Sequence, residues 1–314
     1  MANSTDSRTL SQRYIDLHLH STASDGAYRP ARLVEMAHAR DLSAIALTDH
    51  DTTAGLAEAA ERAPQLGIEF VPGIELEAFH PRGVMHILGY FIDAECPALE
   101  TFAGQARVRR AERNRAILEK LEPQGIRIGP LEFEGREIDT IGRPHIADAL
   151  VRLGHARSFR AAFDDYLGEK GAAYVALQLP RAEDAIAAIR SAGGFASLAH
   201  PVRLRAESLL ELKTTLKRLR AAGLGGLEVW HPSHSAAQVR DYAEMCVAME
   251  LCPTGGSDFH RLPPSAQRGV GFGSRRLPYE ILEWMRVAWK RTLGPDGATV
   301  KREKAALSQA AAVR

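Results

Sequence analysis

Residues 16–21 are Asp16-Leu17-His18-Leu19-His20-Ser21, and the loop residues Asp25 and Gly26 follow them. From Tyr14 onward, polar and apolar side chains alternate, which predicts a β-strand. Residues two apart in a strand point to the same face, so His18 and His20 share one side, with Asp25 close by. Imidazole and carboxylate groups together suit divalent Zn, Mn or Fe. Two histidines in one strand could also be solvated side chains without a metal. The choice between these two interpretations depends on other segments of the chain.

Several later segments end in the same kinds of side chain. Each is an apolar or glycine-rich run followed by histidine or carboxylate residues: Thr48-Asp49-His50-Asp51, Gly73-Ile74-Glu75, Met85-His86, Ala199-His200-Pro201 and Ser257-Asp258-Phe259-His260. In a parallel β/α barrel the C-terminal ends of the strands meet on one face, and active sites lie there. We therefore expect these side chains, although distant in sequence, to meet in one site.

Strand-like and helix-like segments alternate along most of the chain. Helical patterns cover residues 30–40, 53–66, 181–192, 207–222 and 235–249, and strand patterns cover 14–19, 44–47, 68–76, 83–91, 195–199, 226–230 and 251–254. This alternation predicts an α/β fold built on a TIM-like β/α barrel with parallel strands. The middle of the chain breaks the rhythm with a long helical stretch and short helical pieces. We expect barrel at 14–96 and 172–285, a helical cap inserted at 97–171, and a C-terminal tail at 286–314.

The composition indicates a cytoplasmic globular protein. The 314 residues carry a net charge of +1, so no global field points to a nucleic-acid or membrane surface. We expect no signal peptide and no membrane span, since no apolar run is long enough. Cys96, Cys246 and Cys252 lack the spacing of a zinc knuckle and are expected to stay reduced. The aromatic fraction of 6% gives no indication of a base-stacking platform.

The motifs resemble those of the PHP (polymerase and histidinol phosphatase) family. The resemblance runs from about Tyr14 to Gly271, with the motifs in the family's order: Asp16–Ser21, Thr48–Asp51, Gly73–Glu75, His200-Pro201 and Gly255–His260. It implies a distorted seven-stranded β/α barrel with a trinuclear metal site. The stretches Gly142–Ala147 and Glu228–His234 look like the branch that hydrolyses nucleoside 3',5'-bisphosphates and trims short RNA from its 5' end. Histidinol phosphatases carry a histidine where this chain has Asp25, which argues against that substrate.

The resemblance implies a ligand set for three divalent metals. His18, His20, Glu75 and Asp258 would hold one metal; Glu75, His86 and His200 a second; Asp25, His50 and His260 the third. With a bridging hydroxide as the nucleophile, the charges sum to about +2, which matches a phosphate monoester dianion. Mn is the favoured metal, and Fe or Zn also fit the nitrogen and oxygen ligands.

Several polar residues near these motifs receive other interpretations. His86 lies in a strand close to Glu75, whereas His80 lies in a turn sequence expected to face solvent, so His86 is preferred as the ligand. Glu77 is interpreted as a neighbouring salt-bridge partner. Asp16 and Asp49 precede ligating histidines and are expected to orient imidazoles.

Substrate contacts are expected from His231 and from two arginines. His231 follows an apolar strand, so it could contact the substrate phosphate or the leaving oxygen as a catalytic group, or it could simply pack at the barrel rim. Arg113 and Arg143 are the candidates for gripping a second phosphate, because guanidinium groups fit phosphate oxygens. The remaining arginines of the cap helix are interpreted as a solvated face.

These features together predict a metal-dependent phosphoesterase. We expect it to remove the 3'-phosphate of nucleoside 3',5'-bisphosphates, leaving 5'-mononucleotides, and to act as a 5'-to-3' exonuclease on short RNA. The nucleotide or the RNA 5' end would be its partner, with no membrane and no obligate protein partner. The alternatives are a phosphatase of another phosphomonoester, such as a sugar or amino-alcohol phosphate, and a non-catalytic metal-binding module.

Overall fold

The core of the molecule is one nearly closed, barrel-shaped sheet. The computed structural model describes residues 13–133, 136–262, 271–273 and 276–293. Its strands are β1 (Tyr14–Asp16), β2 (Leu42–Leu47), β3 (Glu69–His80), β4 (Gly83–Tyr90), β5 (Phe195–Leu198), β6 (Gly226–Trp230), β7 (Cys252–Gly255) and β8 (Leu277–Pro278). Their order in the sheet is β7-β6-β5-β4-β3-β2-β1-β8. The α/β barrel expected from the sequence is confirmed, with a short eighth strand beside the seven that were predicted.

The sheet is mixed rather than parallel throughout, which corrects the expected strand directions. Strand β4 runs antiparallel to both of its neighbours, β3 and β5, and β8 runs antiparallel to β1. The reason for the first reversal is local. Only Pro81 and Arg82 separate β3 from β4, and a parallel connection needs a crossover of a dozen residues or more.

Among the described residues, six helices cover the barrel. They are α1 (Pro30–His38), α2 (Leu56–Gln65), α6 (Ala182–Ser191), α7 (Leu209–Ala221), α8 (Ala236–Met249) and α9 (Glu280–Leu293). Between the sheet and its helices lies a continuous core of buried aliphatic side chains, including Leu33, Leu47 and Ile74. No helix in the described part of the chain is both long and apolar enough to cross a membrane.

Helix α9 closes the barrel at the end where most of the strands begin. Ile281, Leu282 and Met285 pack into the core that fills the barrel interior, and Trp289 donates a hydrogen bond to the carbonyl of Gly193, just before β5. The predicted C-terminal tail therefore starts inside a packed helix, and its residues from 294 onward lie outside the described part. Because α9 occupies this end, the opposite end of the barrel is left for a site.

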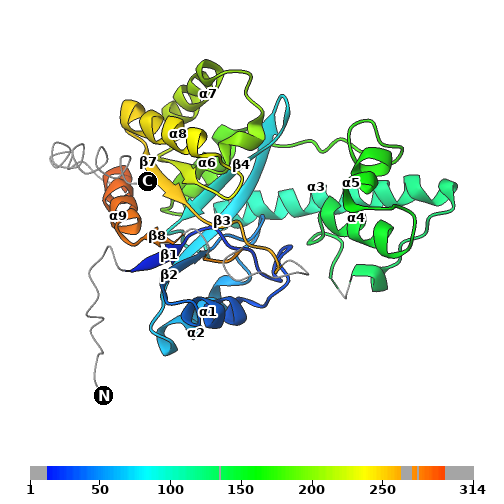
Figure 1. The fold of residues 1–314 in the computed structure, drawn as a ribbon, viewed down its shortest axis with the longest axis horizontal. Helices are drawn as coiled ribbons and strands as arrows, with labels where there is room; N and C mark the ends of the chain where they lie inside the picture. The colour runs from blue at the N-terminus through cyan, green and yellow to red at the C-terminus, as the bar shows by residue number, and fades with distance from the viewer. Residues whose placement is uncertain (1–12, 134–135, 263–270, 274–275, 294–314) are drawn as a thin grey trace.

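A helical cap stands beside the barrel, joined to it by the long helix α3 (Pro97–Leu121), as Figure 1 shows. After α3 come two 3₁₀ turns, helices α4 (Arg143–Arg152) and α5 (Phe159–Ala162), and a π-helical turn at Phe163–Leu167. The cap has its own buried apolar cluster, with Ile117, Ile146 and Leu150 among its members. We propose the boundaries 97–171 for this unit.

Candidate metal centre

Backbone pairing brings the ends of distant strands together at the open end of the barrel. Beyond β1, Leu19 forms a bridge with Phe259, and His20 N–H donates to the Phe259 carbonyl at 3.0 Å. Beyond β2, His50 forms a bridge with Glu75 of β3. These contacts bring the side chains at the ends of these strands together at the open end of the barrel, as expected from the sequence.

The first group of potential ligands contains His18, His20 and Glu75, which are buried, and Asp258, which is partly buried. One oxygen of Glu75 lies 3.3 Å from Nε2 of His18 and 3.2 Å from Nε2 of His20. One oxygen of Asp258 lies 3.4 Å and 3.2 Å from the same two nitrogens. Two nitrogens and two oxygens therefore surround one point, and this group coincides with the first predicted set.

The second group contains the predicted trio Asp25, His50 and His260, with His20 added. Asp25 Oδ1 lies 3.2 Å from Nε2 of His260 and 3.7 Å from Nδ1 of His20. The other oxygen of Asp25 lies 3.9 Å from Nε2 of His50. His20 thus presents its two ring nitrogens to two adjacent groups.

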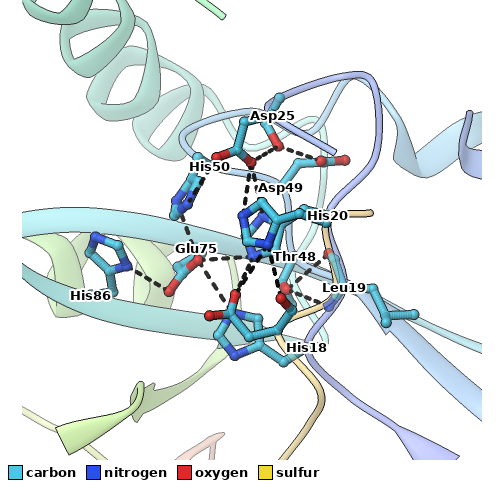
Figure 2. Close-up of polar contacts among 12 residues, drawn as sticks. His18, Leu19, His20, Asp25, Thr48, Asp49, His50, Glu75 and His86 are labelled. Atoms are coloured by element: carbon cyan, nitrogen blue, oxygen red, sulfur yellow. Dashed lines mark hydrogen bonds and ion pairs between the residues drawn. The ribbon is translucent and has the colours of Figure 1, made fainter. Parts of the chain in front are cut away.

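The third group differs in one member from the predicted set. It contains His50, Glu75 and His86, whereas the sequence analysis placed His200 with Glu75 and His86. His200 is nevertheless close, because its Nε2 lies 3.1 Å from Oε1 of Glu75. Figure 2 shows Glu75 in the middle of the cluster, between His18, His50 and His86. Glu75 belongs to two of the groups, as expected for a bridging carboxylate.

The choice of His86 over His80 agrees with the geometry. His86 Nδ1 lies 2.8 Å from Oε1 of Glu75. His80 is at the far end of the same hairpin, where its Nδ1 accepts a hydrogen bond from the Arg82 backbone. The expectation that His80 faces solvent is wrong, because its side chain is buried in the folded hairpin.

The cluster has the features of a site that binds metal ions. Nε2 of His18, both ring nitrogens of His20, Nδ1 of His50 and Oε2 of Glu75 are buried, with no hydrogen-bond partner among the described residues. Buried polar atoms are normally paired, so such a concentration of unpaired donor atoms indicates a missing partner. Their nitrogen and oxygen chemistry fits borderline divalent cations. The residues present therefore fit the expected metals.

Electrostatics keeps the carboxylates of the cluster ionised. Burial alone would raise the pKa of Glu75, but the neighbouring imidazoles of His86, His50 and His18 hold it well below its usual value. Asp25 and Asp258 are shifted in the same direction by the same kind of neighbours. Burial lowers the pKa of His50 to about 3 and that of His200 to about 4. Burial also acts to lower the pKa of His18, His20 and His86, but the neighbouring carboxylates outweigh it: they raise the pKa of His18 and His86 and raise that of His20 to about 10. Because metals bind ionised carboxylates and neutral imidazoles, metal binding at these three histidines would release protons.

Glu228 supports the cluster from behind, a role that the sequence analysis missed. This buried carboxylate of β6 lies 2.9 Å from Nδ1 of His18 and accepts the backbone N–H of His200 at 2.6 Å. Asp16 and Asp49, from which imidazole orientation was expected, instead accept hydrogen bonds from backbone N–H groups and serine hydroxyls of the site loops. A carboxylate within an otherwise apolar strand was the available signal for Glu228.

His231 and Arg203 reach the cluster through Asp258. Oδ2 of Asp258 lies 3.2 Å from Nε2 of His231 and accepts a hydrogen bond from Arg203 at 2.7 Å. His231 is buried at the barrel rim and its Nδ1 lies 2.6 Å from the Ser233 hydroxyl. Both residues leave the other oxygen of Asp258 turned toward His18 and His20.

A cavity of about 1160 Å³ opens beside the cluster and runs between barrel and cap. Its wall includes potential ligands of the centre, namely Asp25, His50, His86, His200 and His260. It also includes the basic residues Arg82, Arg110, Arg113, Arg143, Lys170, Arg203, Arg205 and Arg261. The cavity is therefore suited to an anionic ligand larger than a single phosphate group.

Two neighbouring arginines of the cap helix have different roles. Arg110 forms ion pairs with Asp51 and with Glu77, as expected for Glu77. Arg113 is also largely buried, but it forms no ion pair within the described residues and makes a hydrogen bond of 3.3 Å to Asn114. Burial lowers its pKa to about 10, so it remains charged at neutral pH. Arg113 therefore presents a cation to the cavity that no carboxylate neutralises directly.

The fold and the donor groups define a metal-binding β/α barrel whose site lies at the open end. The model of the PHP domain matches residues 16–191, and the chain belongs to the PHP-domain family. Three similar proteins differ in their described activities. The chain is 39% identical over 260 residues, 82% of this chain and 90% of the relative, to a 3',5'-nucleoside bisphosphate phosphatase of Chromobacterium violaceum.

The other two relatives and one solved structure extend the comparison. The phosphoribosyl 1,2-cyclic phosphate 1,2-diphosphodiesterase of Eggerthella lenta is 35% identical, covering 78% of this chain and 93% of that one. The 5'-3' exoribonuclease Rnm of Escherichia coli is 34% identical, covering 81% and 87%. A solved structure from Bifidobacterium adolescentis, described as a "putative metal-dependent phosphoesterase", superposes with a TM-score of 0.77 at 31% identity, covering 88% of this chain and 96% of that one.

Proposed function

We propose that this protein is a metal-dependent phosphoesterase that removes the 3'-phosphate of nucleoside 3',5'-bisphosphates. The observation that carries the proposal is the cavity that joins the cluster around Glu75 to Arg113 and Arg143 of the cap. A substrate with two phosphates would present one to the cluster and the other to the arginines. The similarity to the Chromobacterium violaceum phosphatase supports this substrate class.

The proposed centre holds three divalent metals, with Mn favoured. The donors would be His18, His20, Asp25, His50, Glu75, His86, His200, Asp258 and His260. When bound, such metals supply Lewis-acid activation of water and of the phosphate oxygens. Cys96, Cys246 and Cys252 are free, and the cytoplasmic location expected from the sequence stays a proposal.

The protein side chains would bind and orient the substrate around this chemistry. Arg113 and Arg143 would hold the 5'-phosphate by charged hydrogen bonds. Glu228 keeps the His18 ring in place, and His231 with Arg203 keeps Asp258 in place. His231 lies next to Asp258, so we propose that it also contacts the departing 3'-phosphate.

The size of the cavity also supports activity on short RNA. It has room beyond a single nucleotide, and basic residues continue past the cluster to Arg203 and Arg205 on the barrel side. The 5' end of an oligonucleotide would occupy the same position as the bisphosphate. The Escherichia coli relative bears the name of a 5'-3' exoribonuclease.

The first experiment compares the intact chain with Asp258→Ala on adenosine 3',5'-bisphosphate in the presence of Mn. We expect release of phosphate and 5'-AMP by the intact chain alone. Equal activity in both would contradict the ligand assignment. Hydrolysis of ribose phosphates or cyclic phosphates in preference to the bisphosphate would favour the alternative phosphoesterase substrates, and metal binding without any hydrolysis would favour a non-catalytic module.

The second phosphate site is tested by Arg113→Met, with Arg115→Met on the exposed side of the same helix as the control. A lost charged hydrogen bond corresponds to about a 10- to 100-fold change in affinity. We expect KM for the 3',5'-bisphosphate to rise by that factor in Arg113→Met and to stay unchanged in the control. With 3'-AMP, which lacks the 5'-phosphate, both variants should match the intact chain.

A further inference from the structure

An aromatic pair lies in the cavity wall on the cap side. Phe159 is the first residue of α5, and Phe163 follows one helical turn later; their ring centroids are 5.2 Å apart. Both rings line the cavity that contains the potential metal ligands. Phe163 packs against the apolar cluster of the cap, whereas the Phe159 side chain is 46% exposed. The pair thus offers one supported, accessible ring face.

The local structure holds this ring at the wall. Ser158 caps α5 by accepting the N–H of Ala161 at 3.1 Å, which fixes the first turn from which Phe159 projects. Phe159 differs from other exposed apolar side chains, such as Phe79 and Leu131, because it lines the cavity. About half of the residues that line this cavity are charged, so an aromatic ring there provides an apolar surface in an otherwise polar wall.

The phosphate-binding side chain lies beside the aromatic pair. The guanidinium of Arg143 is 5.9 Å from the ring centroid of Phe163, and its Nη1 donates to the Leu167 carbonyl at 3.4 Å. A ligand whose anionic group binds Arg143 would therefore bring its adjoining part close to the rings. In a nucleotide, an aromatic base adjoins the phosphate through one sugar.

We propose that Phe159, supported by Phe163, is the platform on which the nucleobase of the substrate stacks. This inference rests on the proposed function and specifies how the base is bound. Stacking needs only the π-face that every base has, and two rings suffice for it despite the low aromatic content of the chain. We therefore expect the platform to favour nucleotides over base-free phosphates with little discrimination between bases.

Direct binding tests this platform separately from turnover. Calorimetric titration compares 5'-AMP with ribose 5-phosphate, which shares the sugar and phosphate but lacks the base. We expect the intact protein to bind 5'-AMP about 5- to 100-fold more tightly, the range typical of stacking on one side chain. In Phe159→Ala this preference should disappear, in Phe159→Tyr it should persist, and 5'-UMP should behave like 5'-AMP.

The control is Phe79→Ala, which removes a ring of similar exposure (55%) from the β3–β4 hairpin, outside the cavity wall. This variant should keep the full preference for 5'-AMP. Equal binding of 5'-AMP and ribose 5-phosphate by the intact protein, or an unchanged preference in Phe159→Ala, would overturn the platform. Loss of the preference in Phe159→Ala without any bisphosphate hydrolysis by the intact protein would support the platform and overturn the proposed reaction.

Discussion

At the scale of single residues, the potential ligands could be predicted and their supports could not. Histidines at the ends of apolar runs, such as His18 and His50, stand out in the sequence because that position has few other uses. Glu228 does not stand out, because its role depends on which way the side chain of β6 points inside the barrel. In the structure it contacts the His18 ring and the backbone of His200. The role of a residue that positions other residues can be recognised only in the folded structure.

The support by Glu228 can be measured with Glu228→Gln. The amide keeps the shape of the side chain but loses the charge that faces Nδ1 of His18. Loss of such a partner typically reduces metal affinity about 10- to 100-fold. We expect the Mn concentration for half-maximal activity to rise by that factor, with most of the maximal rate recovered at saturating Mn.

The control for this variant is Glu119→Gln on the exposed face of α3. It should leave the Mn titration unchanged. An unaltered Mn requirement in Glu228→Gln, or a rate that no Mn concentration restores, would show that Glu228 does not act through the metal ligands.

Arg110 illustrates a residue that the sequence analysis interpreted wrongly. It was expected on a solvated face, but its guanidinium is buried between Asp51 and Glu77. Removing one partner of a buried ion pair costs about 3–5 kcal/mol, because the remaining charge stays buried. We expect Arg110→Met to lower the free energy of unfolding by this amount in a denaturant titration.

Arg113→Met is the matched comparison for stability. It removes an arginine three residues further along the same helix, and this arginine has no ion pair within the described residues. Its free energy of unfolding should change by less than about 1 kcal/mol. Similar destabilisation in both variants would contradict the different roles assigned to Arg110 and Arg113.

At the scale of elements, hydrophobic patterning predicted where strands and helices lie, and it could not predict strand direction. Polarity alternates in the same way in parallel and antiparallel strands, so the reversal of β4 depends on the short Pro81-Arg82 turn. The backbone conformation at the strand ends is a second feature that the sequence does not predict. Asp51, His200 and Asp258 have positive φ angles of 51°, 23° and 52°. Such conformations are uncommon for residues other than glycine and cluster at functional sites.

The close approach of two strand ends gives a prediction at this scale. A Cβ atom added at Gly256, just beyond β7, would lie 2.3 Å from Cβ of His18 and 2.4 Å from its backbone nitrogen. The backbones must separate to accept it, and overpacking of this kind costs about 1–3 kcal/mol. We expect Gly256→Ala to lose stability by that amount and to weaken Mn binding, because His18 itself moves.

The control is Gly104→Ala in α3, where the nearest atom to the new Cβ is Arg107 Nη2 at 3.6 Å. Alanine favours the helix interior, so this variant should gain up to about 1 kcal/mol. If Gly256→Ala were as stable as the intact protein with unchanged Mn binding, the two strand ends would not be packed as described.

At the scale of the whole molecule, the cap and the barrel together make the cavity. The two units can be told apart in the sequence because their hydrophobic patterns differ, but those patterns do not show which surfaces of the units meet. Arg261 beyond β7 donates to Asp148 of α4 at 2.8 Å, which joins the barrel rim to the cap. Arg136 of the cap donates to the carbonyls of Ser24 and Gly26 at 2.8 Å and 2.5 Å. The cap thus holds the loop that carries Asp25 on both sides of this residue.

The contact of Arg136 predicts that the cap influences metal binding. Asp25 belongs to the group with His50 and His260, and its position depends on a loop that Arg136 holds by two hydrogen bonds from a charged donor. Hydrogen bonds of this kind contribute about 1.5–3 kcal/mol each, although part of this loss would be offset by water. We expect Arg136→Ala to lower the affinity for the Mn bound by the Asp25 group about tenfold or more in calorimetric titration, while the overall fold is retained.

Arg152→Ala distinguishes this coupling from a general loosening of the cap. Arg152 forms an ion pair with Glu132 inside the cap and is exposed on its surface, so its loss should leave Mn binding unchanged. Equal weakening in both variants would mean that cap stability, and not the contact with the Asp25 loop, controls the site. Unchanged Mn binding in Arg136→Ala would mean that the barrel positions Asp25 without the cap. The expected difference between the two variants follows from one structural fact: only Arg136 of this pair of cap arginines donates to the loop around Asp25.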